Sequence, residues 1–337
     1  MLDLAFTHLG KEIEDLLGQK LPRENISLLE PPKDVGDDAT KILVKDNQKQ
    51  NQYVILISPE KYPDAVSNYV NQIDQAKEAL GKTLSRNVLN YEKAGRVNNQ
   101  SYVILPFYDS FRVSNRISWP FARKQLRPAI FNWLVNATNQ TRTPPTESEL
   151  QLSFIGNLSY IRDNHDIDDH IRETASNALK EIDNQTWQPH FCLAHNDLWV
   201  GNILLTKCAF RLFKYMDLNN KIILIDWAGS RIKGYPIFDL IRISQSLDVV
   251  DWVIKGELKK HSEKLGCEPA QSAYYLLAAF GHIGLNLGEY PYIRYMDMVH
   301  HLSGTLNNAL AASDSKILHS LSPFIQITKK IKNKLAS

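Results

Sequence analysis

The sequence has few cysteines, no long apolar segment and little net charge. Its 337 residues include three cysteines, Cys192, Cys208 and Cys267, which are too scattered for a disulfide framework or a zinc site. No uninterrupted apolar run approaches the ~20 residues of a membrane span, and the N-terminus lacks the pattern of a signal peptide. A net charge of +2 gives no electrostatic basis for nucleic-acid binding. We therefore expect a cytoplasmic protein with no transmembrane segment and no nucleic-acid partner.

One short stretch combines three chemically distinctive side chains. Residues 195–205 read HNDLWVGNILL, which contains the pattern H-x-D-x-x-x-x-N, and the apolar run 222–225 then ends in Asp226. Phosphoryl transfer needs a carboxylate beside the acceptor hydroxyl, with an amide and a second carboxylate for Mg²⁺. In this interpretation Asp197 orients the hydroxyl and takes its proton. Asn202 and Asp226 offer the hard oxygen atoms that suit Mg²⁺.

The same pattern has a structural alternative. H-x-D-x-x-x-x-N is expected by chance in about one chain in a hundred of this size. A buried histidine and aspartate in a polar turn, with Asp226 at the end of a strand, would also produce it. The apolar run before Asp226 and the segment GYPIFDL at 234–240 are further parts of one constellation. Their combination favours the phosphoryl-transfer interpretation.

Residues 195–204 resemble the catalytic loop of the aminoglycoside phosphotransferase, choline kinase and fructosamine kinase family. Members of that family are small-molecule kinases with a protein-kinase-like fold. The segment Ile225-Asp226-Trp227 resembles the family's metal-binding segment, which stands where protein kinases carry D-F-G. The resemblance is strongest over residues 190–242.

The resemblance implies a role for each matching residue. Asp197 matches the catalytic base, and Asn202 and Asp226 match the two metal ligands. His195 matches the histidine that braces the loop, and Asp239 matches the structural aspartate that ties the loop down. ATP and Mg²⁺ are the implied cofactors, and the implied partner is a small-molecule hydroxyl acceptor.

The resemblance also implies an α+β fold of two lobes: a small antiparallel-sheet lobe at 1–106 that binds nucleotide, and a larger, mainly helical catalytic lobe at 107–337. Periodicity and turn residues agree with a kinase small lobe. Helices are predicted at 3–18 and 64–80, and strands at 26–29, 41–45, 53–58 and 101–106. Gly36 lies in the implied phosphate loop, and backbone groups at Leu105 and Phe107 would meet the adenine. No G-x-G-x-x-G run occurs, and the family is often sparing with glycine at this loop.

The third predicted strand departs from the kinase pattern. Kinases place a lysine there, which pairs with the nucleotide phosphates and with a helix glutamate. Leu56 occupies the lysine position, and Gln72 or Gln75 occupies the glutamate position. Three explanations remain open: Lys41 or Lys45 on the neighbouring strand supplies the charge, the chain binds nucleotide without transferring phosphate, or the strand alignment is shifted.

The larger lobe is expected to build the acceptor pocket from helices. Helices are predicted at 119–136, 241–254, 272–287 and 295–312, with one or two more over 147–183. Trp199 is the first acceptor-contact candidate, because the catalytic loop must hold it near Asp197. Further candidates are aromatic or polar: Trp252, His282, Asn286, Tyr290 and Tyr292. The carboxylates of Asp248, Asp251, Glu257 and Glu289 would suit a basic acceptor, whereas aromatic rings would suit a sugar face or a quaternary amine.

The sequence therefore predicts an enzyme, an ATP- and Mg²⁺-dependent kinase that phosphorylates a hydroxyl of a sugar or amino-alcohol. The alternative is a pseudokinase-type protein that binds a nucleotide or a partner without transfer activity, because Leu56 replaces the expected lysine. A protein substrate is disfavoured, since too few residues separate Asp226 from Asp239 to form an activation segment. The histidine- and aspartate-rich stretch 165–170 has no metal-ligand spacing, and a polar helix start explains it better.

Overall fold

The computed structural model describes residues 2–30, 38–110, 119–206, 218, 221–288 and 290–312. The chain divides into two compact units, and each is discontinuous in sequence. The first comprises Met1–Ile130 and Gly201–Arg231, and the second comprises Phe131–Val200 and Ile232–Ser337. Within the described residues, no helix is both long and apolar enough to cross a lipid bilayer.

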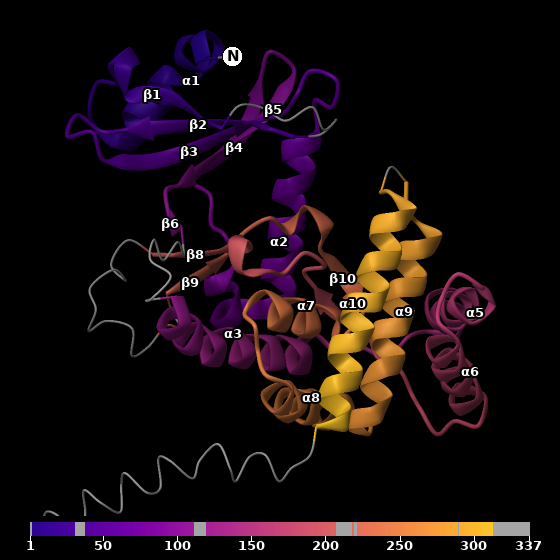
Figure 1. Ribbon diagram of the computed structural model, residues 1–337. Helices are drawn as coiled ribbons and strands as arrows, with labels where there is room; N and C mark the ends of the chain where they lie inside the picture. Colours follow the sequence, from indigo (N-terminus) through magenta and orange to yellow (C-terminus); the bar gives the residue numbers. More distant parts are fainter. Residues whose placement is uncertain are drawn as a thin grey trace, which may run out of the picture. The chain divides into compact units, whose positions relative to one another are not determined.

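The first unit is built on a five-stranded antiparallel sheet in the order β1-β2-β3-β5-β4 (Figure 1). Its strands are β1 (Ile26–Glu30), β2 (Thr40–Lys45), β3 (Asn51–Ile57), β4 (Lys93–Val97) and β5 (Gln100–Pro106). Alternate residues of the central strands are apolar and fully buried, among them Ile42 and Ile55. These side chains pack against Leu9 and Ile13 of α1 (Leu2–Leu17). One face of the sheet is therefore covered by α1, because side chains alternate between the two faces of a strand.

The helix α2 (Ala65–Leu84) is anchored to the sheet at its N-terminus. The first N–H groups of a helix have no partner within the helix. Here the backbone N–H of Val66 donates to the Ser58 hydroxyl at 2.9 Å, and the N–H of Ser67 donates to the Ser101 hydroxyl at 3.0 Å. The two hydroxyls also bond each other at 2.7 Å. These buried contacts fix where α2 begins, and therefore where its later turns lie.

A second sheet in the first unit contains β6 (Asp109–Ser110), β8 (Ile203–Leu205) and β9 (Ile222–Leu224) in the order β6-β8-β9. The strands β8 and β9 are antiparallel, with Ile203 opposite Leu224. Asn202 directly precedes β8, and Asp226 follows β9 by two residues. The pairing therefore brings the backbone at the start of β8 next to the backbone at the end of β9.

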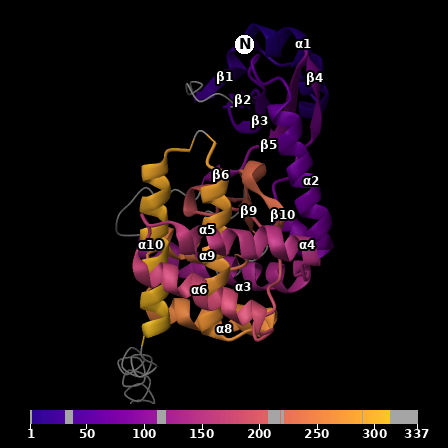
Figure 2. The ribbon, with the colours of Figure 1, turned by 90° about the vertical axis from the view of Figure 1, so that its right-hand side faces the viewer.

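The second unit is mainly helical (Figure 2). The helix α3 (Trp119–Thr141) leads into it, and its other helices are α4 (Glu147–Glu149), α5 (Gly156–Asp163), α6 (Asp169–Asp183), α7 (Phe238–Ser246), α8 (Asp251–Leu265), α9 (Ser272–Leu285) and α10 (Tyr292–Ala311), with a π-helical turn at Leu150–Ile155. The helices α9 and α10 pack along each other (Figure 1). Buried aromatic rings form part of the core, with Phe154 and Phe191 at a centroid distance of 5.0 Å.

The strands β7 (Cys192–Ala194) and β10 (Arg231–Gly234) pair in a two-stranded sheet, and β7 directly precedes the motif in the sequence. A β-carbon at Gly234 would lie 2.4 Å from the β-carbon of Ala194. Glycine is therefore required there for the two strands to approach. This close pairing holds the residues that follow each strand, His195 and Tyr235, in fixed relation within the unit.

The structure corrects two sequence-based element predictions. The strand β4 was not predicted, because four of its five residues are exposed and carry no apolar alternation. The predicted continuous helix at 241–254 is wrong: α7 ends at Ser246 and α8 begins at Asp251. Between them Asp248 has a left-handed backbone with a φ of 46°. The apolar spacing continues across this break, so periodicity alone could not locate it.

The buried His261 of α8 makes the stability of the second unit dependent on pH. Its Nδ1 lies 3.3 Å from the Thr138 hydroxyl. Burial, assisted by the nearby charge of Lys260, lowers the pKa of His261 from 6.5 to about 4. The unfolded chain binds this proton at a higher pH than the folded chain does. The contribution of the neutral, buried His261 side chain to stability is therefore complete above pH 6.5, and it is lost as the pH falls towards 4.

Urea unfolding at pH 7 and pH 5 measures this effect. Between pH 7 and pH 5, the free energy of unfolding of the wild-type protein should fall by about 2 kcal/mol more than that of the His261→Gln variant, whose side chain does not titrate. Equal losses in both proteins would show that His261 does not carry the acid sensitivity.

Candidate active site

The motif loop in the second unit is held by one buried carboxylate. Asp239, in the first turn of α7, accepts the backbone N–H of His195 at Oδ2 over 2.6 Å and that of Asn196 at Oδ1 over 2.9 Å. Asn196 has a left-handed φ of 65°, a conformation that asparagine tolerates better than most residues. The contacts agree with the structural role that the family resemblance implied for Asp239.

Burial of Asp239 has a cost that its neighbours offset. Burial raises the pKa of the Asp239 carboxyl group above its ordinary value. The nearby His195, the hydrogen bonds from the two backbone amides and the charge of Arg242 each act to lower that pKa. His195 is itself buried. A buried carboxylate that is satisfied by backbone amides fixes the loop geometry rather than reacting.

The loop presents Asp197 and Trp199 outward while it buries the residue between them. Leu198 is fully buried, whereas 44% of Trp199 is exposed. The loop is anchored again at Val200, whose N–H donates to the Ser246 hydroxyl at 3.1 Å. The guanidinium of Arg242 pairs with Oδ1 of Asp197, and 32% of the Arg242 side chain and 40% of the Asp197 side chain are accessible to solvent. The predicted base is therefore held by α7 and remains reachable.

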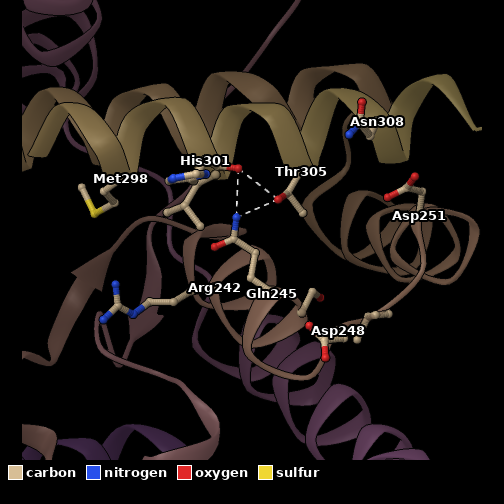
Figure 3. A pocket seen from close by; sticks show the side chains of 11 residues that line it. Arg242, Gln245, Asp248, Asp251, Met298, His301, Thr305 and Asn308 are labelled. Atoms are coloured by element: carbon tan, nitrogen blue, oxygen red, sulfur yellow. Dashed lines mark hydrogen bonds between the residues drawn. The ribbon is translucent and has the colours of Figure 1, made fainter. Parts of the chain in front are cut away.

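Arg242 also lines a cavity of about 610 Å³ in the second unit (Figure 3). The cavity lies among α7, α8 and α10, and its lining comprises Arg242, Ser244, Gln245, Asp248, Val249, Asp251, Met298, His301, Leu302, Thr305 and Asn308. In Figure 3 Arg242 lies at one end, and Asp251 and Asn308 lie at the other. Gln245 donates to the backbone carbonyl of His301 at 2.9 Å and to the Thr305 hydroxyl at 2.7 Å. The cavity is thus polar, with carboxylates at one end and the partner of Asp197 at the other.

The backbone segments that carry the predicted metal ligands, Asn202 and Asp226, are paired in the first unit. The N–H of Ile225 donates to the backbone carbonyl of Asn202 at 3.0 Å. Asp226 follows in a left-handed conformation with a φ of 65° and a ψ of 56°. Trp227 is fully buried, and its indole N–H donates to the Leu224 carbonyl at 2.8 Å, which closes the turn. An amide oxygen and a carboxylate at adjacent backbone positions are a donor set that fits Mg²⁺, an ion that commonly retains several water ligands.

Leu56 occupies the position on the third strand where a kinase lysine was expected, and the sheet register shows which residue lies opposite it. In the sheet of the first unit, Lys41 of β2 stands directly opposite Leu56 of β3. Directly paired residues share one face of a sheet. Strand alternation places both residues on the face opposite α1, together with Leu105 of β5. The ammonium of Lys41 lies 3.4 Å from Asp38. A cation is therefore present on the same sheet face as Leu56, one strand away.

The remaining predicted residues have diverse positions. Phe107 continues the sheet, with its N–H donating to the Gln52 carbonyl at 2.8 Å. Gly36 lies outside the described residues. The cavity lining contains the acidic candidates Asp248 and Asp251. It contains none of the described aromatic or polar acceptor candidates that the sequence suggested, which are Trp199, Trp252, His282, Asn286, Tyr290 and Tyr292.

Sequence reasoning missed two residues that contact the motif. Arg242 pairs with Asp197, and the hydroxyl of Tyr69 accepts the N–H of Asp226. Arg242 follows Asp239 by three residues, and residues three apart on a helix lie on one face. That spacing is a signal that could have placed Arg242 near the loop. Tyr69 has no such signal, because 157 residues separate it from its partner.

Comparison with known proteins identifies the fold. A GDP complex of a mutant aminoglycoside 2'-phosphotransferase-IIIa matches with a TM-score of 0.52 and 12% sequence identity, over 90% of this chain and 98% of that chain. Choline kinase LicA from Streptococcus pneumoniae matches with a TM-score of 0.45 and 14% identity, over 88% of this chain and 99% of that chain. No protein-family model matches the sequence, and no curated protein matches it. The chain therefore has the kinase-like α+β fold of the aminoglycoside phosphotransferase, which confirms the predicted fold class.

Proposed function

We propose that the protein is an ATP- and Mg²⁺-dependent kinase that phosphorylates a hydroxyl of a small molecule. The observation that carries the proposal is the loop tied down by Asp239: its Asp197 pairs with Arg242, and Arg242 lines a polar cavity. The fold agrees with this activity, because the matched solved structures include an aminoglycoside phosphotransferase. In this proposal the lobe at 1–106 binds the nucleotide, and the lobe at 107–337 binds the acceptor.

Asp197 acts on the acceptor hydroxyl. It accepts a hydrogen bond from that hydroxyl, aims the oxygen at the terminal phosphorus of ATP and takes the proton as the new phosphorus–oxygen bond forms and the bond to the leaving ADP breaks. Arg242 keeps the carboxylate in one orientation, and Leu198 anchors the loop beneath it. Asn202 and Asp226 would hold Mg²⁺, which neutralises charge on the nucleotide phosphates when bound.

The acceptor is a sugar or an amino-alcohol that occupies the cavity beside Arg242. Asp248 and Asp251 offer carboxylates to an amino group, and Thr305 and Asn308 offer hydrogen-bonding groups to hydroxyls. Trp199 belongs to the acceptor side as well, because its exposed ring lies two residues from Asp197.

Lys41 supplies the phosphate-binding charge in place of the strand lysine. It shares a sheet face with Leu56, and its distances of 3.4 Å to Asp38 and 3.7 Å to Glu30 are those of a partly exposed ion pair network. Such pairs contribute only about 0 to 1 kcal/mol. The ammonium is therefore available to exchange these carboxylates for a nucleotide phosphate.

Exchanging the residues at positions 41 and 56 tests this assignment. The Lys41→Leu variant should bind Mg²⁺-ATP about 10- to 100-fold more weakly, because a hydrogen bond to a charged group is lost. Adding Leu56→Lys should restore most of the affinity, since it returns the cation to the paired position. Calorimetric titration with Mg²⁺-ATP measures both changes.

The control for the exchange is Lys45→Leu, which removes a lysine at the other end of the same strand. It should leave ATP affinity within about twofold of wild type, because a distant exposed charge contributes little in physiological salt. Equal losses at positions 41 and 45 would rule out a specific phosphate contact by Lys41.

A binding protein without transfer activity is the second candidate, favoured by Leu56 at the lysine position. Two measurements are combined: the first establishes nucleotide binding, and the second separates the candidates. A ligand that binds only the folded state raises the melting temperature. Mg²⁺-ATP should therefore stabilise the protein whether it is a kinase or a nucleotide-binding protein without transfer activity. An ATP-consumption screen across sugars, amino-alcohols and aminoglycosides should find an acceptor only for the kinase. Stabilisation by Mg²⁺-ATP with no consumption on any acceptor would favour the binding protein.

A further inference from the structure

The backbone of Asp226 adopts a conformation that needs support. Its φ of 65° and ψ of 56° are left-handed, a region that residues with a β-carbon occupy at an energetic cost. The N–H of Asp226 donates to the hydroxyl oxygen of Tyr69 at 3.3 Å. The Asp226 side chain is exposed. The support therefore comes through the backbone and leaves the carboxylate facing outward.

Tyr69 is itself rigidly placed. It lies in the second turn of α2, between the buried residues Val66 and Val70. The N-terminus of α2 is fixed by the Ser58 and Ser101 hydroxyls. The helix therefore holds the backbone of Tyr69 in place, and the hydroxyl of Tyr69 restricts the backbone of Asp226 through the hydrogen bond between them.

A second contact joins the same helix face to the same turn. Gln72 lies three residues after Tyr69, on one face of α2. Its Oε1 accepts the hydroxyl of Ser230 at 3.3 Å. Two positions of α2, three residues apart, thus contact residues 226 and 230 of one short segment, and both contacts lie within the first unit.

These contacts stand where kinases use an ion pair. In kinases the strand lysine and a helix glutamate must pair for the site to be complete. At the positions that the sequence assigns to that pair, this chain has Leu56 and either Gln72 or Gln75, which cannot form it. The helix instead reaches the segment containing Asp226 directly, through one hydroxyl and one amide.

We infer that Tyr69 is a positioning residue that sets the backbone of Asp226, so that α2 is coupled to the metal site by a direct hydrogen bond instead of a lysine–glutamate ion pair. The inference rests on the proposed role of Asp226 as a metal ligand. Removal of the Tyr69 hydroxyl releases the left-handed turn, and the carboxylate then spends less time in the orientation that binds Mg²⁺.

The Tyr69→Phe variant tests the inference by removing one oxygen atom. Calorimetric titrations with ATP in the presence and in the absence of Mg²⁺ give the gain in affinity that Mg²⁺ provides. That gain should fall about 5- to 20-fold in the variant, as expected for one lost hydrogen bond. Affinity without Mg²⁺ should be unchanged. In the protein without nucleotide, hydrogen exchange at the Asp226 amide should become faster.

The matched control is Tyr53→Phe. Tyr53 lies in the same unit, and its hydroxyl donates one hydrogen bond of the same length, 3.3 Å, to the Leu16 carbonyl. This variant should lose stability but keep the wild-type gain from Mg²⁺. A second test variant, Gln72→Leu, should reduce the gain less than Tyr69→Phe does, because its partner Ser230 lies four residues from Asp226.

The outcomes separate this inference from the proposed function. If wild type gains affinity from Mg²⁺ and Asp226→Asn loses the gain, but Tyr69→Phe keeps it, the positioning role is wrong and the proposed function stands. A similar reduction in Tyr69→Phe and Tyr53→Phe would reduce the role of Tyr69 to general stability and overturn the inference. Absence of any gain in wild type would overturn both proposals.

Discussion

The Asp197→Asn substitution should lower kcat by about 10³-fold or more, because general-base catalysis contributes about 10²- to 10⁴-fold and an amide cannot take the proton. Asparagine has the shape of aspartate, so the loop held by Asp239 should keep its conformation. Affinity for Mg²⁺-ATP should change by less than about threefold, because the base acts in the transfer step and does not bind the nucleotide. Steady-state kinetics and calorimetry together measure the two effects.

The matched control for this substitution is Asp163→Asn. Asp163 is also an exposed aspartate paired with an arginine, with 2.7 Å between Arg162 Nε and its Oδ1. It lies at the C-terminal end of α5, outside the motif and the cavity lining. Its substitution should leave kcat unchanged. An Asp197→Asn enzyme that loses only a few-fold in kcat would show that another group accepts the proton.

The Asp226→Asn substitution should weaken Mg²⁺-ATP binding by about 30-fold or more, because a neutral amide replaces a charged ligand of a hard cation. Asparagine accepts the left-handed conformation of this residue, so the change removes charge without straining the turn. ATP binding without Mg²⁺ should be similar to wild type or slightly tighter, since one negative charge is gone. Titrations with and without Mg²⁺ distinguish this outcome from unfolding.

Asp248 offers a matched control for position 226. It is also an aspartate in a left-handed conformation, with a φ of 46°, but it lines the cavity assigned to the acceptor. The Asp248→Asn variant should bind Mg²⁺-ATP as wild type does and should weaken acceptor binding instead. Equal loss of nucleotide affinity at both positions would contradict the assignment of Asp226 as the metal ligand.

The motif residues could be predicted from the sequence because the chemistry is local. Asn202 follows Asp197 by five positions, and an apolar strand of ordinary composition leads to Asp226. Asp239 could be assigned from the resemblance, and the structure places its carboxylate on the N–H groups of His195 and Asn196. The roles of the base and the metal ligands remain predictions.

Other features depend on tertiary structure. The pairing of Lys41 with Leu56 is set by strand register, and a one-residue shift would move either side chain to the other face. Periodicity predicted α2, but nothing local indicated that its Tyr69 would meet a backbone amide far along the chain. The cavity that we assign to the acceptor was similarly unpredictable, since it depends on the break between α7 and α8 at Asp248.

The central claim is transfer of a phosphoryl group to a small-molecule hydroxyl, and phosphorus NMR tests it most directly. The protein is incubated with Mg²⁺-ATP and pools of sugars, amino-alcohols and aminoglycosides, and the spectrum is followed with time. A new phosphate monoester signal should grow as ATP becomes ADP, and this signal should be absent with Asp197→Asn. A wild-type protein that binds Mg²⁺-ATP but forms no monoester with any pool would contradict the claim.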